Sequence, residues 1–318
     1  MGSAATRFRR ANKGNMDGNI YRQLCDILGE ASVLVDEPMK RHTTFRIGGK
    51  ADYFVCPDSA EKLRQILDLC REESLPWFIL GNGSNLLVSD AGYRGVVIQI
   101  YKKYQEVSIE GDRIRAGAGI LLSRLASLAG EAELTGLEFA SGIPGTLGGA
   151  IFMNAGAYGG EMKDLVESVT LLDGQGQVQT LAGRDLQMGY RTSLVKEKGW
   201  IVLRAVLGLQ KGKADLIRQR MEELREARCS RQPLELPSAG STFKRPEGYF
   251  AGKLIMDAGL RGFRVGGAMV SEKHCGFVVN AGDATAADVR QLMQQVQEKV
   301  WERFHVRLEP EVRFLGEF

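Results

Sequence analysis

The sequence holds few of the residues on which metal sites, disulfide scaffolds and membrane spans depend. Its 318 residues include five cysteines, an odd number without any C-x-x-C spacing, and three histidines that lie far apart. This distribution argues against a disulfide framework or a zinc site and favours a reducing compartment, so we expect a cytoplasmic protein without a metal. No apolar run reaches the length of a membrane span, so we also expect no membrane insertion.

The common nucleotide-binding signatures are missing as well. The chain has neither a complete G-x-G-x-x-G after a strand nor a G-x-x-x-x-G-K-[ST], which argues against a Rossmann fold and a P-loop. The net charge of +3 is too small to indicate nucleic-acid binding, and no stripe of basic and aromatic residues accompanies it. We therefore expect no nucleic-acid partner.

What the sequence does contain is glycine in two clusters. The uncharged segment 142–160 reads G-I-P-G-T-L-G-G-A-I-F-M-N-A-G-A-Y-G-G, and Gly81-Asn82-Gly83-Ser84-Asn85 directly follows an apolar strand pattern at 77–80. Peptide N–H groups in such segments can surround an anion without any cationic side chain. Asn154 and Tyr158 add polar groups to an apolar wall, which suits a partly aromatic ligand with a phosphate tail. A glycine-rich turn between buried elements is the simpler alternative.

The patterns along the chain predict an α+β protein of about two domains behind a short arm. Residues 1–19 are polar and basic, and we expect a poorly ordered arm rather than a signal peptide. Residues 20–85 predict a small α/β unit, and residues 86–212 predict a mixed unit of short strands around the glycine segment. Residues 213–318 begin with a charged helix, include a long helix capped by Thr285, and end in a strand pattern at 307–314.

Three further places carry reactive groups where a hydrophobic core would not place them. Arg191 lies in G-Y-R-T-S between predicted strands, Ser241 in the turn S-A-G-S, and Glu311 in E-P-E-V-R. A loop arginine is most often solvated, a turn serine usually bonds to its own backbone, and alternation places Glu309, Glu311 and Arg313 most simply on the outer face of an edge strand. Alternatively, the Arg191 guanidinium binds a carboxylate or phosphate, and the cations after Ser241 receive a polyanionic substrate. Both interpretations stay open at this point.

Seven motifs run through most of the chain in the order found in one enzyme family. They are T-T-F-R-I-G-G at 43–49, G-N-G-S-N at 81–85, S-G-I-P-G-T-L-G-G-A at 141–150, N-A-G-A-Y-G at 154–159, Y-R-T-S at 190–193, P-S-A-G-S-T-F-K-R-P at 237–246 and L-E-P-E-V-R-F at 308–314. In these motifs the sequence resembles the UDP-N-acetylenolpyruvoylglucosamine reductases of peptidoglycan precursor synthesis. The resemblance implies a two-part FAD-binding module of the vanillyl-alcohol-oxidase (PCMH) type, followed by a C-terminal α/β substrate-binding domain.

The resemblance also implies a reaction and a set of site residues. NADPH gives a hydride to non-covalently bound FAD, and the reduced flavin passes it to C3 of the enolpyruvyl group of UDP-N-acetylglucosamine enolpyruvate, which yields UDP-N-acetylmuramate. Ser241 would protonate C2, while Arg191 and Glu311 would hold the substrate carboxylate and stabilise an enol-like intermediate. The implied FAD contacts are Arg46, Ile47, Gly48, Gly49, Gly81, Asn82, Gly83, Ser84, Asn85, Gly142, Ile143, Pro144, Gly145, Thr146, Gly148, Gly149, Asn154 and Tyr158. The implied substrate contacts are Tyr190, Lys244, Arg245 and Arg313.

The resemblance is to the shorter form of the family, because only residues 208–213 separate the last predicted strand of the second unit from the helix that begins at Ala214. We expect a cytoplasmic monomer whose partners are the enolpyruvyl nucleotide sugar and NADPH. Two alternatives remain: another flavin-dependent oxidase or dehydrogenase of the same fold, and a non-catalytic protein that binds a nucleotide sugar. Colourless protein that releases no flavin on denaturation would favour the second alternative.

Overall fold

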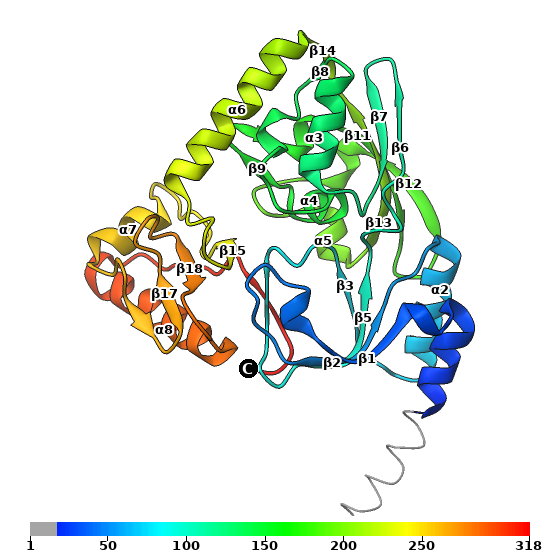
Figure 1. Cartoon of the computed structure of the whole chain (residues 1–318), viewed down its shortest axis with the longest axis horizontal. Coiled ribbons are helices and arrows are strands. Elements are labelled where there is room, and N and C mark those ends of the chain that lie inside the picture. The colour runs from blue at the N-terminus through cyan, green and yellow to red at the C-terminus, as the bar shows by residue number, and fades with distance from the viewer. Residues whose placement is uncertain (1–17) are drawn as a thin grey trace, which may run out of the picture.

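The structure is a computed structural model that describes residues 18–318. The expectation of a poorly ordered arm at 1–19 therefore lies outside the described residues, except that residues 18 and 19 already belong to a helix that continues to residue 28. Figure 1 shows two sheet-containing parts, one above the other, and a smaller α/β domain beside them.

The first part is a small sheet with helices beside it. Its strands pair in the order β1 (Val33–Pro38), β2 (Lys50–Val55), β5 (Tyr93–Gln99) and β3 (Trp77–Leu80), with only β1 antiparallel to its neighbour. Helix α2 (Ala60–Glu72) begins after Ser59, whose hydroxyl accepts a hydrogen bond from the N–H of Lys62 at 3.3 Å. Strand β5 follows residue 85, where the sequence suggested a boundary, and it alone joins β2 to β3.

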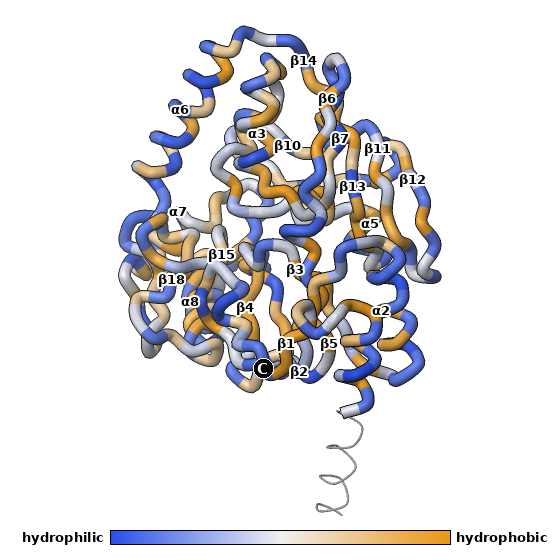
Figure 2. Tube along the Cα trace, turned by 45° about the vertical axis from the view of Figure 1, so that its right-hand side comes forward, coloured by the Kyte–Doolittle hydropathy of each residue, from blue (hydrophilic) through white to orange (hydrophobic). Residues whose placement is uncertain are grey.

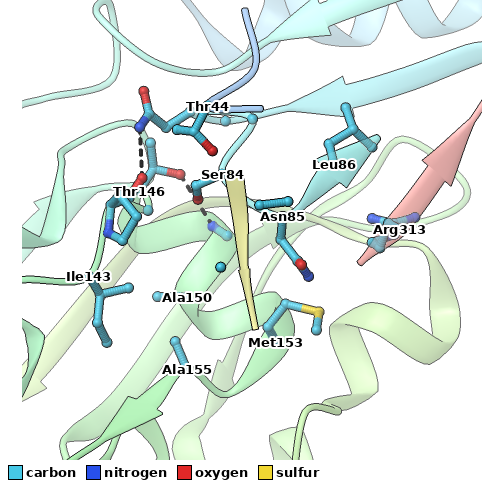
Figure 3. Close-up of a pocket in the computed structure, with 18 of the residues that line it drawn as sticks. Thr44, Ser84, Asn85, Leu86, Ile143, Thr146, Ala150, Met153, Ala155 and Arg313 are labelled. Carbon is cyan, nitrogen blue, oxygen red and sulfur yellow. Dashed lines mark hydrogen bonds between the residues drawn. The ribbon is translucent and has the colours of Figure 1, made fainter. Parts of the chain in front are cut away.

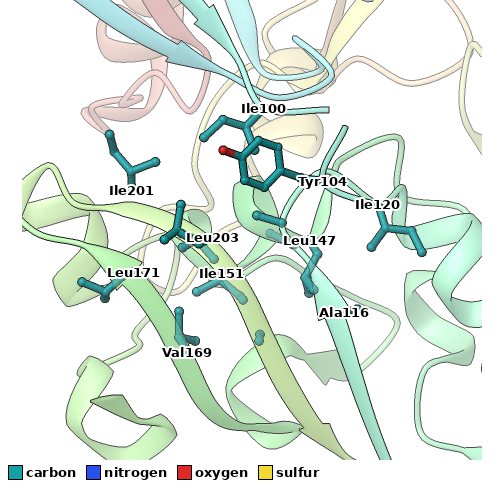
Figure 4. Close-up of a cluster of buried hydrophobic side chains, with 14 of the residues drawn as sticks. Ile100, Tyr104, Ala116, Ile120, Leu147, Ile151, Val169, Leu171, Ile201 and Leu203 are labelled. Carbon is teal, nitrogen blue, oxygen red and sulfur yellow. The ribbon is translucent and has the colours of Figure 1, made fainter. Parts of the chain in front are cut away.

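The second part is a fully antiparallel sheet covered by helices. Its strands pair in the order β12 (Val178–Ala182), β11 (Val166–Leu172), β13 (Ile201–Gly208), β7 (Arg113–Gly117) and β6 (Val107–Glu110). The helices are α3 (Leu122–Glu131) and α4 (Leu147–Met153), and α4 forms inside the glycine segment. Figure 4 shows Leu147 and Ile151 of α4 beside Leu203 of β13, and all three are buried. Burial of each such side chain contributes about 1.5–3 kcal/mol.

Short elements complete this part. Strand β8 (Leu134–Thr135) pairs with β14 (Gln210–Lys211), and β9 (Gly156–Ala157) pairs with β10 (Gly160–Glu161). The short helix α5 (Leu194–Lys198) follows Ser193, which caps it.

The third part begins with helix α6 (Ala214–Arg231), whose mainly hydrophilic surface is visible in Figure 2. A four-stranded antiparallel sheet follows, in the order β15 (Ser238–Ser241), β18 (Phe277–Asn280), β17 (Ala268–Val270) and β16 (Arg264–Val265). Helices α7 (Ala251–Asp257) and α8 (Ala286–Phe304) complete it. The predicted Thr285 cap is present as a capping box with Asp288.

The end of the chain returns to the first part. The predicted strand 307–314 shrinks to β19 (Arg313–Leu315), which runs parallel to β4 (Leu86–Val88) directly after the glycine loop at 81–85. Pro310 lacks an N–H, so the preceding residues do not form a continuous ladder. Asp90 adds a second link, because its carboxylate oxygens accept from the N–H groups of Ala286 and Ala287 at 2.8 and 3.0 Å and so cap α8.

Within residues 18–318, none of the helices combines the length and the apolar character that a membrane crossing requires. The same described range holds no group of three or more His, Cys, Asp or Glu side chains that could bind a metal ion.

Candidate active site

A cavity of about 920 Å³ opens where the three parts meet. All three residues implied as catalytic, Arg191, Ser241 and Glu311, line it. The same wall includes loop 81–85 and residues 142–146 of the glycine segment. Figure 3 shows the side chains of Thr44, Ser84 and Asn85 above the apolar side chains of Ile143 and Ala155. The cavity wall therefore combines polar and apolar side chains.

Loop 81–85 is shaped by the need to turn between strands β3 and β4. Gly83 adopts a φ of +64°, and a Cβ there would lie 2.0 Å from the carbonyl oxygen of His42, so only glycine fits. None of the peptide N–H groups of residues 81–85 donates to an acceptor within the described residues. The Asn82 side chain donates to the carbonyl of Pro144 at 2.7 Å and joins this loop to the other glycine cluster.

The glycine segment 142–160 is less open than its sequence suggests. Thr146 caps α4 by accepting from the N–H of Gly149 at 3.3 Å, and the N–H of Gly148 donates to Ala118 at 2.8 Å. Leu147 and Ile143 also donate to backbone carbonyls, so within residues 142–149 only the N–H groups of Gly142, Gly145 and Thr146 have no acceptor among residues 18–318. Much of the hydrogen-bonding capacity expected for a ligand is therefore used by the protein itself.

Asn154 has a structural role in this arrangement. It ends α4 in the left-handed conformation, with a φ of +43°, and is 1% exposed. Its side chain donates to Glu161 at 3.0 Å and to the carbonyl of Gly189 at 2.9 Å, and it accepts from the N–H of Lys163 at 2.9 Å. Asn154 therefore does not face the cavity, but it fixes the turn that carries Arg191.

Arg191 and Glu311 form a close ion pair in the cavity wall. The Nε of Arg191 lies 2.6 Å from Oε1 of Glu311, and the side chains are only 20% and 13% exposed. Arg191 itself has a left-handed backbone, with a φ of +56°, and its carbonyl accepts from Nζ of Lys196 at 2.9 Å. The turn, the ion pair and the lysine together fix where the guanidinium points.

Ser241 and Glu311 come together through backbone pairing between distant segments. The N–H of Glu311 donates to the carbonyl of Thr242 at 2.9 Å, so the residue after Ser241 is hydrogen-bonded to Glu311. Asn85 holds the other side of the segment that carries Glu311, because its side chain donates to the Glu311 carbonyl at 3.1 Å and its own carbonyl accepts from the N–H of Arg313 at 3.1 Å. Glu311 therefore faces the cavity, and the simpler interpretation of an outward-facing edge strand is wrong for this residue.

The charges around this pair are mostly positive. Burial raises the pKa of Glu311, while the nearby Arg191 works against that rise. Burial, together with the charges of Lys244 and Arg313, lowers the pKa of Lys196. Arg313 lines the cavity and lies over the rings of two phenylalanines, 5.2 Å from Phe78 and 4.8 Å from Phe152. A single buried carboxylate among several cations suits an anionic ligand.

Several residues implied by the resemblance lie outside the cavity wall. Ile47 is buried in the core shared with the C-terminal domain, and Gly49 packs so closely that a Cβ would lie 2.2 Å from the Asp90 carbonyl oxygen. Tyr158 is 40% exposed. Like Asn154, these residues do not line the cavity, and the same holds for Gly48.

Tyr190, Lys244 and Arg245 form a group beside the cavity. The N–H of Arg245 donates to the Tyr190 hydroxyl at 3.0 Å, and its guanidinium lies 3.9 Å from the centre of the Phe250 ring. Lys244 pairs with Glu309 at 3.0 Å. None of these three residues, which the resemblance implies as substrate contacts, lines the cavity.

Three cations in the cavity wall escaped the sequence analysis: Lys196, Arg225 and Arg228. Lys196 follows Arg191 by five residues, in a stretch that carries no motif of its own. Arg225 and Arg228 belong to the charged helix α6, where an arginine ordinarily faces solvent. No local pattern distinguishes these residues, because each reaches the cavity only through tertiary packing.

The fold and cavity together define a flavoprotein class: an FAD-binding module followed by a separate C-terminal domain. Residues 51–182 match the family described as "FAD binding domain". Residues 232–315 match the family described as "UDP-N-acetylenolpyruvoylglucosamine reductase, C-terminal domain". Together with the solved relative described below, these matches confirm the predicted fold class, an α+β protein whose FAD-binding module is of the vanillyl-alcohol-oxidase type.

The chain belongs to the UDP-N-acetylenolpyruvoylglucosamine reductase family. It is 54% identical to the reductase of Alkaliphilus oremlandii over 297 aligned residues. These residues cover 93% of this chain and 98% of the relative. It is 52% identical over 299 residues to that of Clostridioides difficile, at 94% and 98% coverage. The crystal structure of the Thermus caldophilus enzyme (MurB) is similar, with a TM-score of 0.77, 38% identity, and coverage of 89% of this chain and 98% of that one.

Proposed function

We propose that this chain reduces UDP-N-acetylglucosamine enolpyruvate to UDP-N-acetylmuramate in peptidoglycan precursor synthesis, with FAD as bound cofactor and NADPH as hydride donor. The relatives carry the name of this reductase, and residues 51–182 match an FAD-binding family. The observation that carries the proposal is the meeting of Arg191, Ser241 and Glu311, from three distant segments, in the wall of the cavity that also contains loop 81–85.

The cavity residues fit an FAD molecule. Loop 81–85 offers peptide N–H groups without a protein acceptor, which suit the diphosphate. The wall also carries apolar side chains such as Ile143, Phe152 and Met153, which suit an aromatic ring system. When bound, FAD supplies the two-electron hydride chemistry that the side chains of the protein lack.

Arg191 binds the carboxylate of the enolpyruvyl group in this proposal. Negative charge grows on the carboxylate side as a hydride arrives at C3, so a guanidinium fixed there in advance stabilises the transition state. Glu311 keeps the guanidinium in place through the 2.6 Å ion pair, and Asn85 fixes the segment that carries Glu311. The burial that raises the pKa of Glu311 also strengthens this pairing, because the surrounding protein screens charge less than water does.

Ser241 supplies the proton at C2. Its side chain lines the cavity and makes no hydrogen bond to another group among residues 18–318, so its hydroxyl is free to donate to a ligand. A hydroxyl is a weak acid, but a carbon that carries developing carbanion character is a strong base, so a weak donor in the right position suffices. Arg313 from the cavity wall, and Tyr190, Lys244 and Arg245 beside it, serve as contacts for the rest of the nucleotide sugar. The enzyme acts as a cytoplasmic monomer.

The substitution Ser241→Ala separates the two halves of this reaction. Reduction of the bound flavin by NADPH delivers no proton to substrate carbon, so we expect its rate to stay within about twofold of wild type. Reoxidation by the enolpyruvyl substrate needs the proton at C2, so we expect it to slow by about 10²- to 10⁴-fold, the usual contribution of a positioned acid. Stopped-flow absorbance of the flavin measures both rates.

Two further variants make this result specific. Ser241→Cys keeps a donor at the same position and should recover part of the lost rate. Ser230→Ala removes the hydroxyl of an exposed serine on α6 that does not line the cavity, and it should change neither rate. Equal slowing of both half-reactions by Ser241→Ala would mean that the serine is not the proton donor. Colourless protein without releasable flavin would contradict the whole proposed function.

A further inference from the structure

The side chain of Arg228, in the cavity wall, forms no ion pair among residues 18–318 and leaves a buried N–H group without an acceptor there. Arg228 lies in the last turns of α6 and reaches over Gly142, the first residue of the glycine segment. A Cβ built on Gly142 would lie 2.7 Å from Nη1 of Arg228 and 3.0 Å from its Cδ. Glycine at 142 therefore gives the guanidinium room to lie directly against the backbone of the segment.

The guanidinium is held in place but not neutralised. Its Nε donates to Oε1 of Gln232 at 2.9 Å, and Nη1 is buried without any hydrogen-bond acceptor among residues 18–318. No carboxylate of that described range forms a salt bridge with Arg228, whereas Arg225, one turn earlier, pairs with Glu222. Burial accordingly lowers the pKa of Arg228. A buried, unpaired charge is costly, and natural proteins keep one mainly where a ligand completes it.

The position of this charge indicates which ligand group it serves. In the glycine segment, several peptide N–H groups already donate to protein acceptors: those of Ile143, Leu147, Gly148 and Gly149. This part of the segment therefore has fewer N–H groups left for an anion than loop 81–85, where none has a protein acceptor. A guanidinium beside Gly142 supplies positive charge and N–H donors at that place. Planar guanidinium groups bind phosphate oxygens through parallel hydrogen bonds, which a carboxamide or a peptide N–H cannot match in strength.

We propose that Arg228 binds the diphosphate of a nucleotide in this cavity and so complements the glycine segment as an anion site. This inference rests on the proposed function, in which two ligands carry a nucleoside diphosphate: FAD and the UDP-sugar substrate. FAD is the ligand that we assign, because Arg228 contacts the same glycine segment as the expected cofactor residues Gly142 to Gly149.

Binding measurements on the full chain test the inference. Apoprotein is titrated with FAD by quenching of flavin fluorescence, and holoprotein is titrated with UDP by calorimetry. We expect Arg228→Gln to weaken FAD binding about 10- to 100-fold, the contribution of a hydrogen-bonded charge, and to leave UDP binding unchanged. Arg228→Lys should retain part of the affinity. Arg220→Gln, which changes an exposed arginine of the same helix paired with Glu223, serves as the matched control and should have no effect.

Two further variants separate ligand binding from a packing role. Gly142→Ala keeps the charge but pushes Nη1 aside, so it should weaken FAD binding in the same direction as Arg228→Gln, though less. Arg228→Met removes a buried unpaired charge and keeps an apolar stem, so the melting temperature of the apoprotein should not fall. A packing role predicts the opposite: a lower melting temperature for apoprotein and holoprotein alike.

The outcomes distinguish this inference from the function on which it rests. A wild-type chain that binds neither FAD nor UDP overturns both. A wild-type chain that binds FAD, with Arg228→Gln binding it as tightly as Arg220→Gln does, leaves the function standing and overturns the inference. Loss of UDP binding with unchanged FAD binding supports a diphosphate contact but overturns the assignment to FAD.

Discussion

The two glycine clusters have similar glycine content but differ in how many of their N–H groups the protein itself uses. In loop 81–85 the peptide N–H groups have no acceptor among the described residues, and Gly83 is required by its left-handed backbone and by the nearby His42 carbonyl. In the segment 142–160 a capped helix uses several N–H groups internally, and Arg228 adds a side-chain N–H that has no acceptor among residues 18–318. Glycine content alone therefore does not identify an anion site. What matters is which donors the fold leaves without a partner.

The strongest test of this comparison is Gly83→Ala. A Cβ would lie 2.0 Å from a backbone oxygen that cannot move freely, and the φ of +64° adds strain. We expect the free energy of unfolding to fall by roughly 3 kcal/mol and FAD binding to weaken by at least about 100-fold, because the loop must shift. Urea denaturation and flavin titration measure the two effects.

Gly111→Ala provides the control for backbone strain. Gly111 has a φ of +66°, but no other atom lies within 4 Å of the place that a Cβ would take, so its substitution measures strain without crowding. We expect a loss of only about 1 kcal/mol and no change in FAD affinity. If Gly83→Ala behaved like Gly111→Ala, the loop would not depend on the contact with His42.

The next largest effect is expected for Asn85→Ala, which tests whether loop 81–85 also positions Glu311. Loss of the hydrogen bond to the Glu311 carbonyl should let the segment that carries Glu311 shift and slow reoxidation by substrate about tenfold. Flavin reduction by NADPH should change less. Asn280→Ala, whose side chain donates across the same domain boundary to Phe45 at 3.4 Å but does not line the cavity, should slow neither step. If both variants slowed reoxidation equally, Asn85 would only hold the two domains together and would have no specific role in positioning Glu311.

A smaller effect is expected for Thr146→Ala, which removes the cap of α4. Loss of an N-cap typically costs about 1 kcal/mol of stability. The freed Gly149 N–H could then serve a ligand, so FAD affinity should fall less than for Gly83→Ala. Thr285→Ala removes the corresponding cap of α8, outside the cavity, and provides the matched stability value. An FAD affinity that falls as far as in Gly83→Ala would contradict the view that α4 is mainly a structural element.

The smallest effect, and the one with the opposite sign, is expected for Gly149→Ala. The nearest atom to its Cβ is Oγ1 of Thr146 at 3.5 Å, so alanine fits the helix and should stabilise the apoprotein by about 0.5 kcal/mol. Gly148→Ala should not share this gain, because its Cβ would lie 3.0 Å from that of Ala118. Thermal melting of the two apoproteins gives the comparison. A loop rather than a helix at this place would show no such difference.

Much of the fold could be predicted from local patterns. Strand 77–80 has the bounds that its apolar pattern indicates, and the long helix begins after Thr285 as its cap predicts. Helix α4 could not be predicted, because its two glycines disfavour a helix and its stability comes from burial of Leu147 and Ile151. Tertiary packing decides where propensity is weak.

In the candidate site, too, local motifs predicted some features, whereas others depend on tertiary packing. The motifs identified Arg191, Ser241 and Glu311, but no local rule could show that Thr242 pairs with Glu311, because that contact depends on the whole chain path. Asn154 was expected to face a ligand, and its polarity is instead used to hold the turn before Arg191. Arg228 has the sequence context of a surface helix, and only its packing against Gly142 makes it part of the cavity.

The parallel pairing of β19 with β4 has a consequence for the order in which the protein is made. Ribosomes release the chain from the N-terminus, so β4 and loop 81–85 emerge long before residues 313–315, which complete their pairing. Until then the nascent β4 has an open edge, on which another strand could pair. The C-terminal domain, between these two strands in the sequence, must therefore leave the ribosome before the flavin site reaches its final form. The β4 strand that follows loop 81–85 therefore gains its β19 partner only when the substrate domain has already been synthesised.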